Sequence, residues 1–183
     1  MPAQTPDPCW SCPSNAGTRF EEIGATGVEW WVQAYLPGNR ELARPLLARA
    51  VAAGARAIVL TVDTPVVGTK ITEGGRSVFD LVPTGQLRVN FDEGYDALPG
   101  AEKATDLGPT DIARLHELTG LPVVVKGVLR GDDARMCVEA GAAAVWVSNH
   151  GGASSTVRSQ PRSRCRGCEQ QWGSRSRCTS TAD

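Results

Sequence analysis

The chain has 183 residues and a formal net charge of -1, with 41% hydrophobic, 21% charged and 5% aromatic residues. This is the composition of one ordinary globular domain, and it excludes a fibrous or wholly disordered protein. No run approaches the ~20 apolar residues that cross a bilayer, and residues 1–12 lack a basic, apolar export signal. We therefore expect a cytoplasmic protein with no membrane partner.

Residues 1–13 resemble no regular element and are expected to form an irregular N-terminal segment. After them, apolar runs alternate with helical patterns in the order strand, helix, strand, long connection, helix, strand, helix, strand. This order predicts βαβ units and a parallel sheet, and therefore an α/β fold. The four expected strands are Trp30 to Tyr35, Ala57 to Val62, Pro122 to Lys126 and Ala143 to Ser148.

Helices are expected in the gaps between these strands. The first spans residues 39–54, and Pro45 within it predicts a late start or a kink. The next two end at Gly120 and Gly141, which are typical C-terminal glycines. The pattern lapses over residues 65–105, and a connection of this length after a strand favours a loop that covers an active site.

Residues 153–183 differ from the rest of the chain. They hold six Arg against two acidic residues, together with seven Ser and three Cys, and they have no Leu, Ile, Phe or Met. Such a segment has nothing to bury, so we expect a disordered tail. A shifted reading frame of a GC-rich gene would give the same abrupt change after Gly152, so a frameshifted or pseudogene fragment is one interpretation. Apart from Trp172 no aromatic residue accompanies the arginines, which argues against nucleic-acid binding.

Two Cys-x-x-Cys pairs, at residues 9–12 and 165–168, lie at opposite ends of the chain. A zinc ribbon places its two pairs about 15 to 20 residues apart, so we predict no metal site.

Polar residues gather where the expected strands end. In a parallel (β/α) barrel the chemistry lies at the carboxyl ends of the strands, so these side chains should face one pocket. Taken singly, an aspartate here could begin a turn and a lysine could end a strand at the surface. Together they predict that a cation, a carboxylate and an imidazole converge. The residues are Gln33, Tyr35, Thr61, Asp63, Lys126, Ser148, Asn149 and His150.

Four motifs at these strand ends carry a resemblance to a known family. WWVQAY, LTVDTPVVGTK, LPVVVKGV and AAAVWVSNHGG, in this order, resemble the strand-end motifs of the FMN-dependent 2-hydroxy acid dehydrogenases and oxidases. The resemblance covers residues 14–152 and implies about half of a TIM-type (β/α)8 barrel. It also implies FMN as cofactor, a small 2-hydroxy acid as substrate, and homo-oligomers for full-length relatives.

The resemblance assigns a role to each strand-end residue. His150 would take a proton from the substrate, because an imidazole changes its charge near working pH, and Asp63 would stabilise the imidazolium. Lys126 would place its charge beside the flavin, while Gln33, Thr61 and Ser148 would donate or accept hydrogen bonds there. Tyr35 would contact the substrate.

Three positions depart from the family pattern. Ala153 follows the two glycines where the family has an arginine that clamps the substrate carboxylate, and Lys70 stands where a second family arginine occurs. Pro13 falls where family members place a hydroxyl near the flavin. Because half a barrel also leaves two open sheet edges, we expect the chain by itself to be inactive. The alternative is a non-catalytic fragment that binds no flavin.

Overall fold

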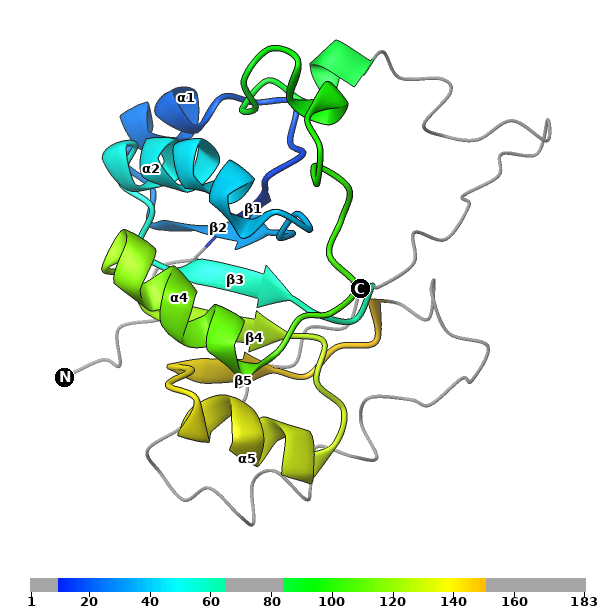
Figure 1. Ribbon diagram of the computed structural model, residues 1–183. Coiled ribbons are helices and arrows are strands. Elements are labelled where there is room, and N and C mark those ends of the chain that lie inside the picture. Colours follow the sequence, from blue (N-terminus) through cyan, green and yellow to red (C-terminus); the bar gives the residue numbers. More distant parts are fainter. Residues whose placement is uncertain (1–9, 65–83, 151–183) are drawn as a thin grey trace, which may run out of the picture.

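The computed structural model of the chain describes residues 10–64 and 84–150 (Figure 1). Within these ranges, five strands form one sheet in the order β1-β2-β3-β4-β5, and every neighbouring pair is parallel. The predicted α/β class and parallel sheet are confirmed, whereas Lys70 and the predicted tail lie outside the described residues. The strands are β1 (Trp10–Pro13), β2 (Trp30–Ala34), β3 (Ile58–Thr61), β4 (Val123–Lys126) and β5 (Ala144–Trp146).

Helices connect the strands and gather on one face of the sheet. Each strand pairs with the next one along the chain, and right-handed crossovers then place every connecting helix on the same face. Figure 1 shows the helices following one another along the sheet in the same order as the strands. This sequential arrangement is that of a sector of a (β/α) barrel. The helices are α1 (Phe20–Ala25), α2 (Arg44–Ala52), α4 (Pro109–Thr119) and α5 (Gly131–Glu139).

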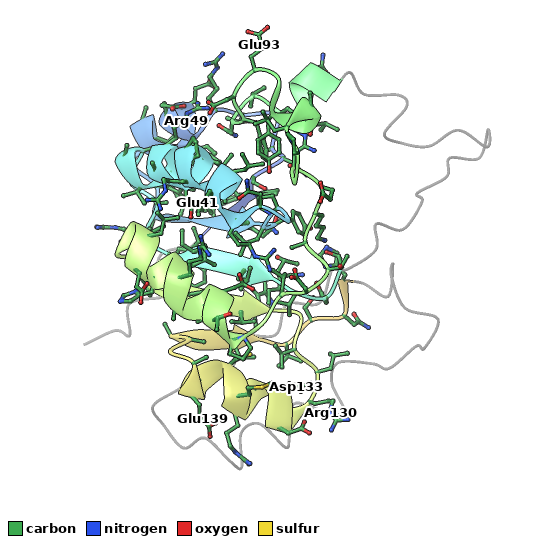
Figure 2. The ribbon with its side chains drawn as sticks, in the orientation of Figure 1. Glu41, Arg49, Glu93, Arg130, Asp133 and Glu139 are labelled. Atoms are coloured by element: carbon green, nitrogen blue, oxygen red, sulfur yellow. The ribbon has the colours of Figure 1, made fainter. Side chains whose placement is uncertain are left out.

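The core lies between the sheet and these helices, and charged side chains cover the outside. Leu47 and Leu115 of the helices are 0% and 2% exposed, and they pack in one cluster with alternate residues of the strands. Figure 2 shows Arg130 and Glu139 at the two ends of α5, pointing away from the sheet. The strand residues of the core cluster are Trp30, Val32, Ala34, Ile58, Leu60, Val123 and Val125, and the partly buried Val145 packs against it.

The strand residues between these core positions face the opposite side of the sheet, because side chains alternate along a strand. They are apolar in the middle of the strands, where Val59 and Val124 are 0% and 5% exposed. At the carboxyl ends they are polar. Gln33, Thr61 and Lys126 therefore share one face and one edge of the sheet.

The N-terminal segment corrects one prediction. Residues 1–13 were expected to be irregular, but Trp10–Pro13 forms β1, with Trp10 paired to Trp30 and Pro13 to Gln33. The strand is short, mostly exposed and ends in proline, so it carries no periodic signal. A proline is tolerated there because β1 has a ladder partner on one side only among the described strands. The sheet therefore has five described strands rather than four.

The helix predicted over residues 39–54 begins late, which is one of the two effects that Pro45 predicted. Residues 40–43 form a 3-10 turn, η1 (Arg40–Ala43), and α2 starts at Arg44, so Pro45 occupies the first turn. An amide hydrogen is not needed at that position, and the fixed φ of proline suits it. The backbone at Gly120 and Gly141 has φ of 69° and 94°, which confirms the predicted C-terminal glycines.

The long connection before α4 lies across the end of β2. It contains η2 (Thr84–Gln86) and η3 (Tyr95–Ala97), and residues 94–104 are called the strap below. The Gly38 amide donates to the Glu102 carbonyl at 2.8 Å and the Ala104 amide to the Leu36 carbonyl at 2.9 Å. The strap is thereby fixed beside the strand end that carries Tyr35. No helix in the described ranges is long and apolar enough to cross a membrane.

Candidate active site

An aspartate and a histidine form the centre of the site. Asp63 follows β3 and His150 follows β5, and Asp63 Oδ1 lies 2.8 Å from His150 Nδ1. The Asp63 side chain is 9% exposed and that of His150 is 28% exposed. The pair is therefore largely shielded from water, which strengthens its interaction.

The shorter contact of Nδ1 favours one tautomer of the imidazole, because Asp63 Oδ1 lies 2.8 Å away and the Lys126 ammonium 3.4 Å away. A carboxylate only accepts hydrogen bonds, so Nδ1 of His150 carries the proton that Asp63 accepts. In the neutral ring Nε2 then keeps its lone pair, and it lies 3.5 Å from the Tyr35 hydroxyl. Nε2 is the atom of this site that is placed to accept a proton.

Lys126 brings a positive charge to the same edge. Its ammonium donates to Ser148 Oγ at 2.9 Å and lies 4.0 Å from Asp63 Oδ2. The Ser148 hydroxyl also accepts from the His150 amide at 3.1 Å, which ties the ammonium to the backbone that carries the imidazole. Asp63 Oδ2 has no hydrogen-bond partner within the described residues.

Polar groups from the first three strands continue this edge. The side-chain amide of Gln33 donates through Nε2 to Thr61 Oγ1 at 2.7 Å, and both side chains are buried. Ser14 follows β1, and its backbone amide donates to the backbone carbonyl of Gln33 at 2.8 Å. Its own Oγ is buried and finds no partner in the described part of the chain. An unsatisfied buried hydroxyl costs roughly 1–3 kcal/mol, so this position favours a ligand that offers a polar group.

Tyr35 closes the site from the end of β2. Its ring lies 4.1 Å from Lys103 Nζ of the strap, and Lys103 also donates to the carbonyl and hydroxyl oxygens of Thr64. Burial raises the pKa of the Tyr35 hydroxyl above its ordinary value, and the negative charge of Asp63 adds to that effect. The hydroxyl therefore stays protonated and can donate a hydrogen bond at neutral pH.

A glycine makes room for Asp63. Gly127 follows β4 with φ of +109°, and a Cβ there would lie 2.5 Å from both Cβ and Cγ of Asp63. His150 also has an uncommon backbone conformation, with φ of 55°. Non-glycine residues avoid this region, which is found more often at functional sites than elsewhere.

The structure brings together the strand-end residues that the sequence predicted. Contacts link Gln33 to Thr61, Tyr35 to His150, His150 to Asp63, and Lys126 to Ser148. Lys70 is a candidate outside the described residues.

Sequence reasoning missed Ser14 and Lys103. It gave Pro13 as the position where family members have a hydroxyl, and it did not consider the hydroxyl of the next residue, Ser14, which follows β1. A strand assignment for the run before Ser14 would have found it. Lys103 lies in a connection without periodicity, so no sequence signal places it here.

The fold and the site define a class of protein: a (β/α)-barrel sheet with an Asp-His pair and a lysine at the carboxyl edge of its strands. Residues 3–164 match the model of the family described as FMN-dependent dehydrogenase. The chain belongs to that family.

Curated relatives agree with this assignment. The chain is 38% identical over 154 residues to mouse 2-hydroxyacid oxidase 1, with 74% of this chain and 41% of the relative covered. It is 38% identical over 150 residues to L-lactate oxidase of Nostoc sp., with 73% and 41% covered. The chain thus spans about two fifths of the length of the relatives it matches.

Solved structures agree with the fold. The lactate oxidase of Pediococcus acidilactici superimposes with a TM-score of 0.64 at 30% identity, over 81% of this chain and 40% of that one. A soluble mutant of the membrane-associated (S)-mandelate dehydrogenase from Pseudomonas putida gives a TM-score of 0.72 at 22% identity, over 89% and 48%. The second likeness concerns the fold alone.

The residues present fit the flavin that the family uses. The polar edge of a flavin ring offers carbonyl oxygens and ring nitrogens, which need both donors and acceptors. Gln33, Thr61 and Lys126 supply such groups, and the unpartnered Ser14 hydroxyl would gain a partner. In the described ranges, no cluster of three or more His, Cys, Asp or Glu residues could hold a metal ion.

Proposed function

We propose that this protein is part of an FMN-dependent oxidoreductase that acts on the CH–OH group of a small 2-hydroxy acid. The observation that carries the proposal is the 2.8 Å contact between Asp63 and His150 Nδ1, which leaves Nε2 beside the Tyr35 hydroxyl. A site that removes a proton from an alcohol needs a base in that protonation state.

His150 takes the proton from the substrate at Nε2. The imidazolium that results carries a positive charge, which the carboxylate of Asp63 stabilises because the pair is largely buried. Tyr35 binds the substrate through its hydroxyl, on the side of the imidazole that faces away from Asp63. When bound, FMN would supply the acceptor for the two electrons and for the second hydrogen that leave the CH–OH group.

Gln33, Thr61, Lys126 and Ser148 hold the flavin, and we add Ser14 to this set. The ammonium of Lys126 is oriented by the Ser148 hydroxyl at 2.9 Å, so its charge is fixed before the ligand binds. A fixed cation favours a group on which negative charge develops. Lys70 completes the substrate side as a point charge, in place of an arginine fork.

A second candidate is a non-catalytic chain that binds no flavin. Ala153 favours the loss of catalysis in this candidate, because the family arginine that clamps the substrate carboxylate is absent at that position of the sequence. The two candidates differ in one observable, which is the affinity of the chain for FMN.

Titration of FMN with the purified chain tests the proposal. We expect saturable quenching of flavin fluorescence, with the affinity reduced about tenfold or more in Lys126→Met. That factor corresponds to loss of one charge-assisted hydrogen bond, worth roughly 1.5–3 kcal/mol. Arg56→Met is the matched control, because Arg56 is 70% exposed and its one ion pair among the described residues is with Glu29 at 3.8 Å. A wild-type chain that does not quench the flavin overturns the proposal and supports the second candidate.

A further inference from the structure

Lys103 is a half-buried cation that neither the sequence motifs nor the proposed chemistry uses. Its backbone is fixed beside the end of β2, because Lys103 forms an antiparallel bridge with Pro37. The Glu102 carbonyl and the Ala104 amide, on either side of Lys103, hydrogen-bond to Gly38 at 2.8 Å and Leu36 at 2.9 Å. The side chain therefore starts from a rigid position.

The ammonium of Lys103 contacts two neighbouring residues of the site. It donates to the carbonyl and hydroxyl oxygens of Thr64, and its nitrogen lies 4.1 Å from the centroid of the Tyr35 ring, within the range of a cation–π interaction. Lys103 can therefore act on the chemistry by holding Thr64 and Tyr35, and its charge also acts on Asp63.

Thr64 and Tyr35, the two residues that the Lys103 ammonium contacts, both adjoin the Asp63-His150 pair. Thr64 is covalently joined to Asp63, and the Tyr35 hydroxyl lies 3.5 Å from His150 Nε2. We propose that Lys103 is a positioning residue, whose ammonium fixes the Tyr35 ring and the Thr64 backbone and thereby sets the places of Tyr35 and Asp63 around His150. The catalytic meaning of this inference rests on the proposed function, but the arrangement itself does not.

The charge state of Lys103 gives the inference a measurable consequence. Burial lowers the pKa of the Lys103 ammonium to about 8, against the opposing effect of the negative charge of Asp63. The groups that act on it are Tyr35, which follows β2, and Asp63, which follows β3; His150 and Lys126 contact Asp63 in turn. Below about pH 8 the cation attracts the ring face; above it, the neutral amine loses that attraction.

The position of the Tyr35 ring should therefore change with a midpoint near pH 8. Tyr35 and Tyr95 are the two tyrosines of the chain, so carbon-13 labelling of tyrosine in a Tyr95→Phe background leaves one ring signal to follow by NMR. We expect a step near pH 8 in the Tyr35 signal that coincides with the titration of the labelled Lys103 side-chain carbon. The sample contains no flavin and no substrate, so failure of FMN binding does not affect the result.

Three variants separate positioning from a general structural role. In Lys103→Met the step near pH 8 should vanish, and the His150 ring signal should shift while that of His116 stays in place. In Lys103→Arg the step should also vanish, because arginine stays charged, but the Tyr35 and His150 signals should remain near their wild-type positions. Arg56→Met, a surface control, should keep the wild-type step.

A step near pH 8 that persists in Lys103→Met overturns the inference, as does a His150 signal that does not move in that variant. If Lys103→Met does not fold, the wild-type titration alone decides. A Tyr35 midpoint that differs from the midpoint of Lys103 then overturns the inference, and a shared midpoint supports it.

Discussion

Gly127 determines how closely β4 can approach the carboxylate of the site. The space for a side chain at this position is already filled by Asp63, whose Cβ and Cγ would lie 2.5 Å from an added Cβ. The φ of +109° excludes an ordinary L-residue for a second, independent reason. Asp63 therefore reaches His150 and Lys126 only because position 127 has no side chain.

Gly127→Ala should lower the free energy of unfolding by at least about 2 kcal/mol, since the clash adds to backbone strain. Gly85→Ala is the control, because a Cβ at Gly85 meets no atom within 4 Å. Its effect should stay within about 0.5 kcal/mol. Urea denaturation followed by circular dichroism measures both, and equal effects of the two substitutions would contradict this account of Gly127.

The candidate residues at the strand ends were predictable because the carboxyl ends of parallel strands share one edge. Thr61, Lys126 and Ser148 needed only correct strand positions, and those follow from apolar runs. Finding Ser14 would have required the prediction of β1, a short strand that is defined by its pairing with β2 and not by a pattern of its own. Lys103 needed the contact of the strap with residues 36–39, which local sequence does not encode.

Among the elements, the connection from β2 to α2 is joined to the start of α4 by one arginine. Arg40 Nε donates to Asp111 Oδ1 at 2.8 Å and Nη2 to Asp106 Oδ1 at 2.8 Å, while Nη1 binds the carbonyls of Pro37 and Gly38. The Asp111 side chain is 8% exposed. These contacts join the connection between β2 and α2 to the segment that follows the strap and to the first turn of α4.

Arg40→Ala should lower the free energy of unfolding by about 3 kcal/mol, because it leaves the buried carboxylate of Asp111 without its charged partner. Arg114→Ala removes a cation from the neighbouring surface, where Arg114 is 50% exposed and pairs with Glu41. Exposed pairs contribute little, so that loss should stay below about 1 kcal/mol. Chemical denaturation compares the two variants, and an Arg40→Ala chain as stable as Arg114→Ala would refute the role given to Arg40.

Element positions were more predictable than element ends. All four expected strands exist, but each is shorter than its apolar run, since Tyr35, Val62 and Ser148 extend beyond the ladders that define β2, β3 and β5. Hydrophobicity indicates where a segment is buried, whereas hydrogen bonds to neighbouring strands decide where it ends. Pro45 predicted the late start of α2 because its effect on the backbone is local.

For the whole molecule, the decisive feature is that the described sheet has two edges. β1 and β5 each pair with one neighbour among the described strands, and Trp10 on β1 is 64% exposed. A barrel sheet normally closes on itself, and closure is what makes its mouth rigid. The Asp63-His150 contact is thus formed among the described residues, but His150 follows β5, which is one of the two edge strands of the described sheet.

We expect this chain, supplied with excess FMN, not to oxidise 2-hydroxy acids measurably. The sequence has Ala153 in place of the carboxylate-clamping arginine, and misplacement of reacting groups by about 1 Å costs on the order of 100-fold in rate. The assay follows flavin bleaching without oxygen in the presence of lactate, glycolate or mandelate, with His150→Ala as the control. Wild type and control should bleach equally slowly. Bleaching that requires both substrate and His150 would instead show that the site in this chain is rigid enough for catalysis, for example because two copies pair along their open edges.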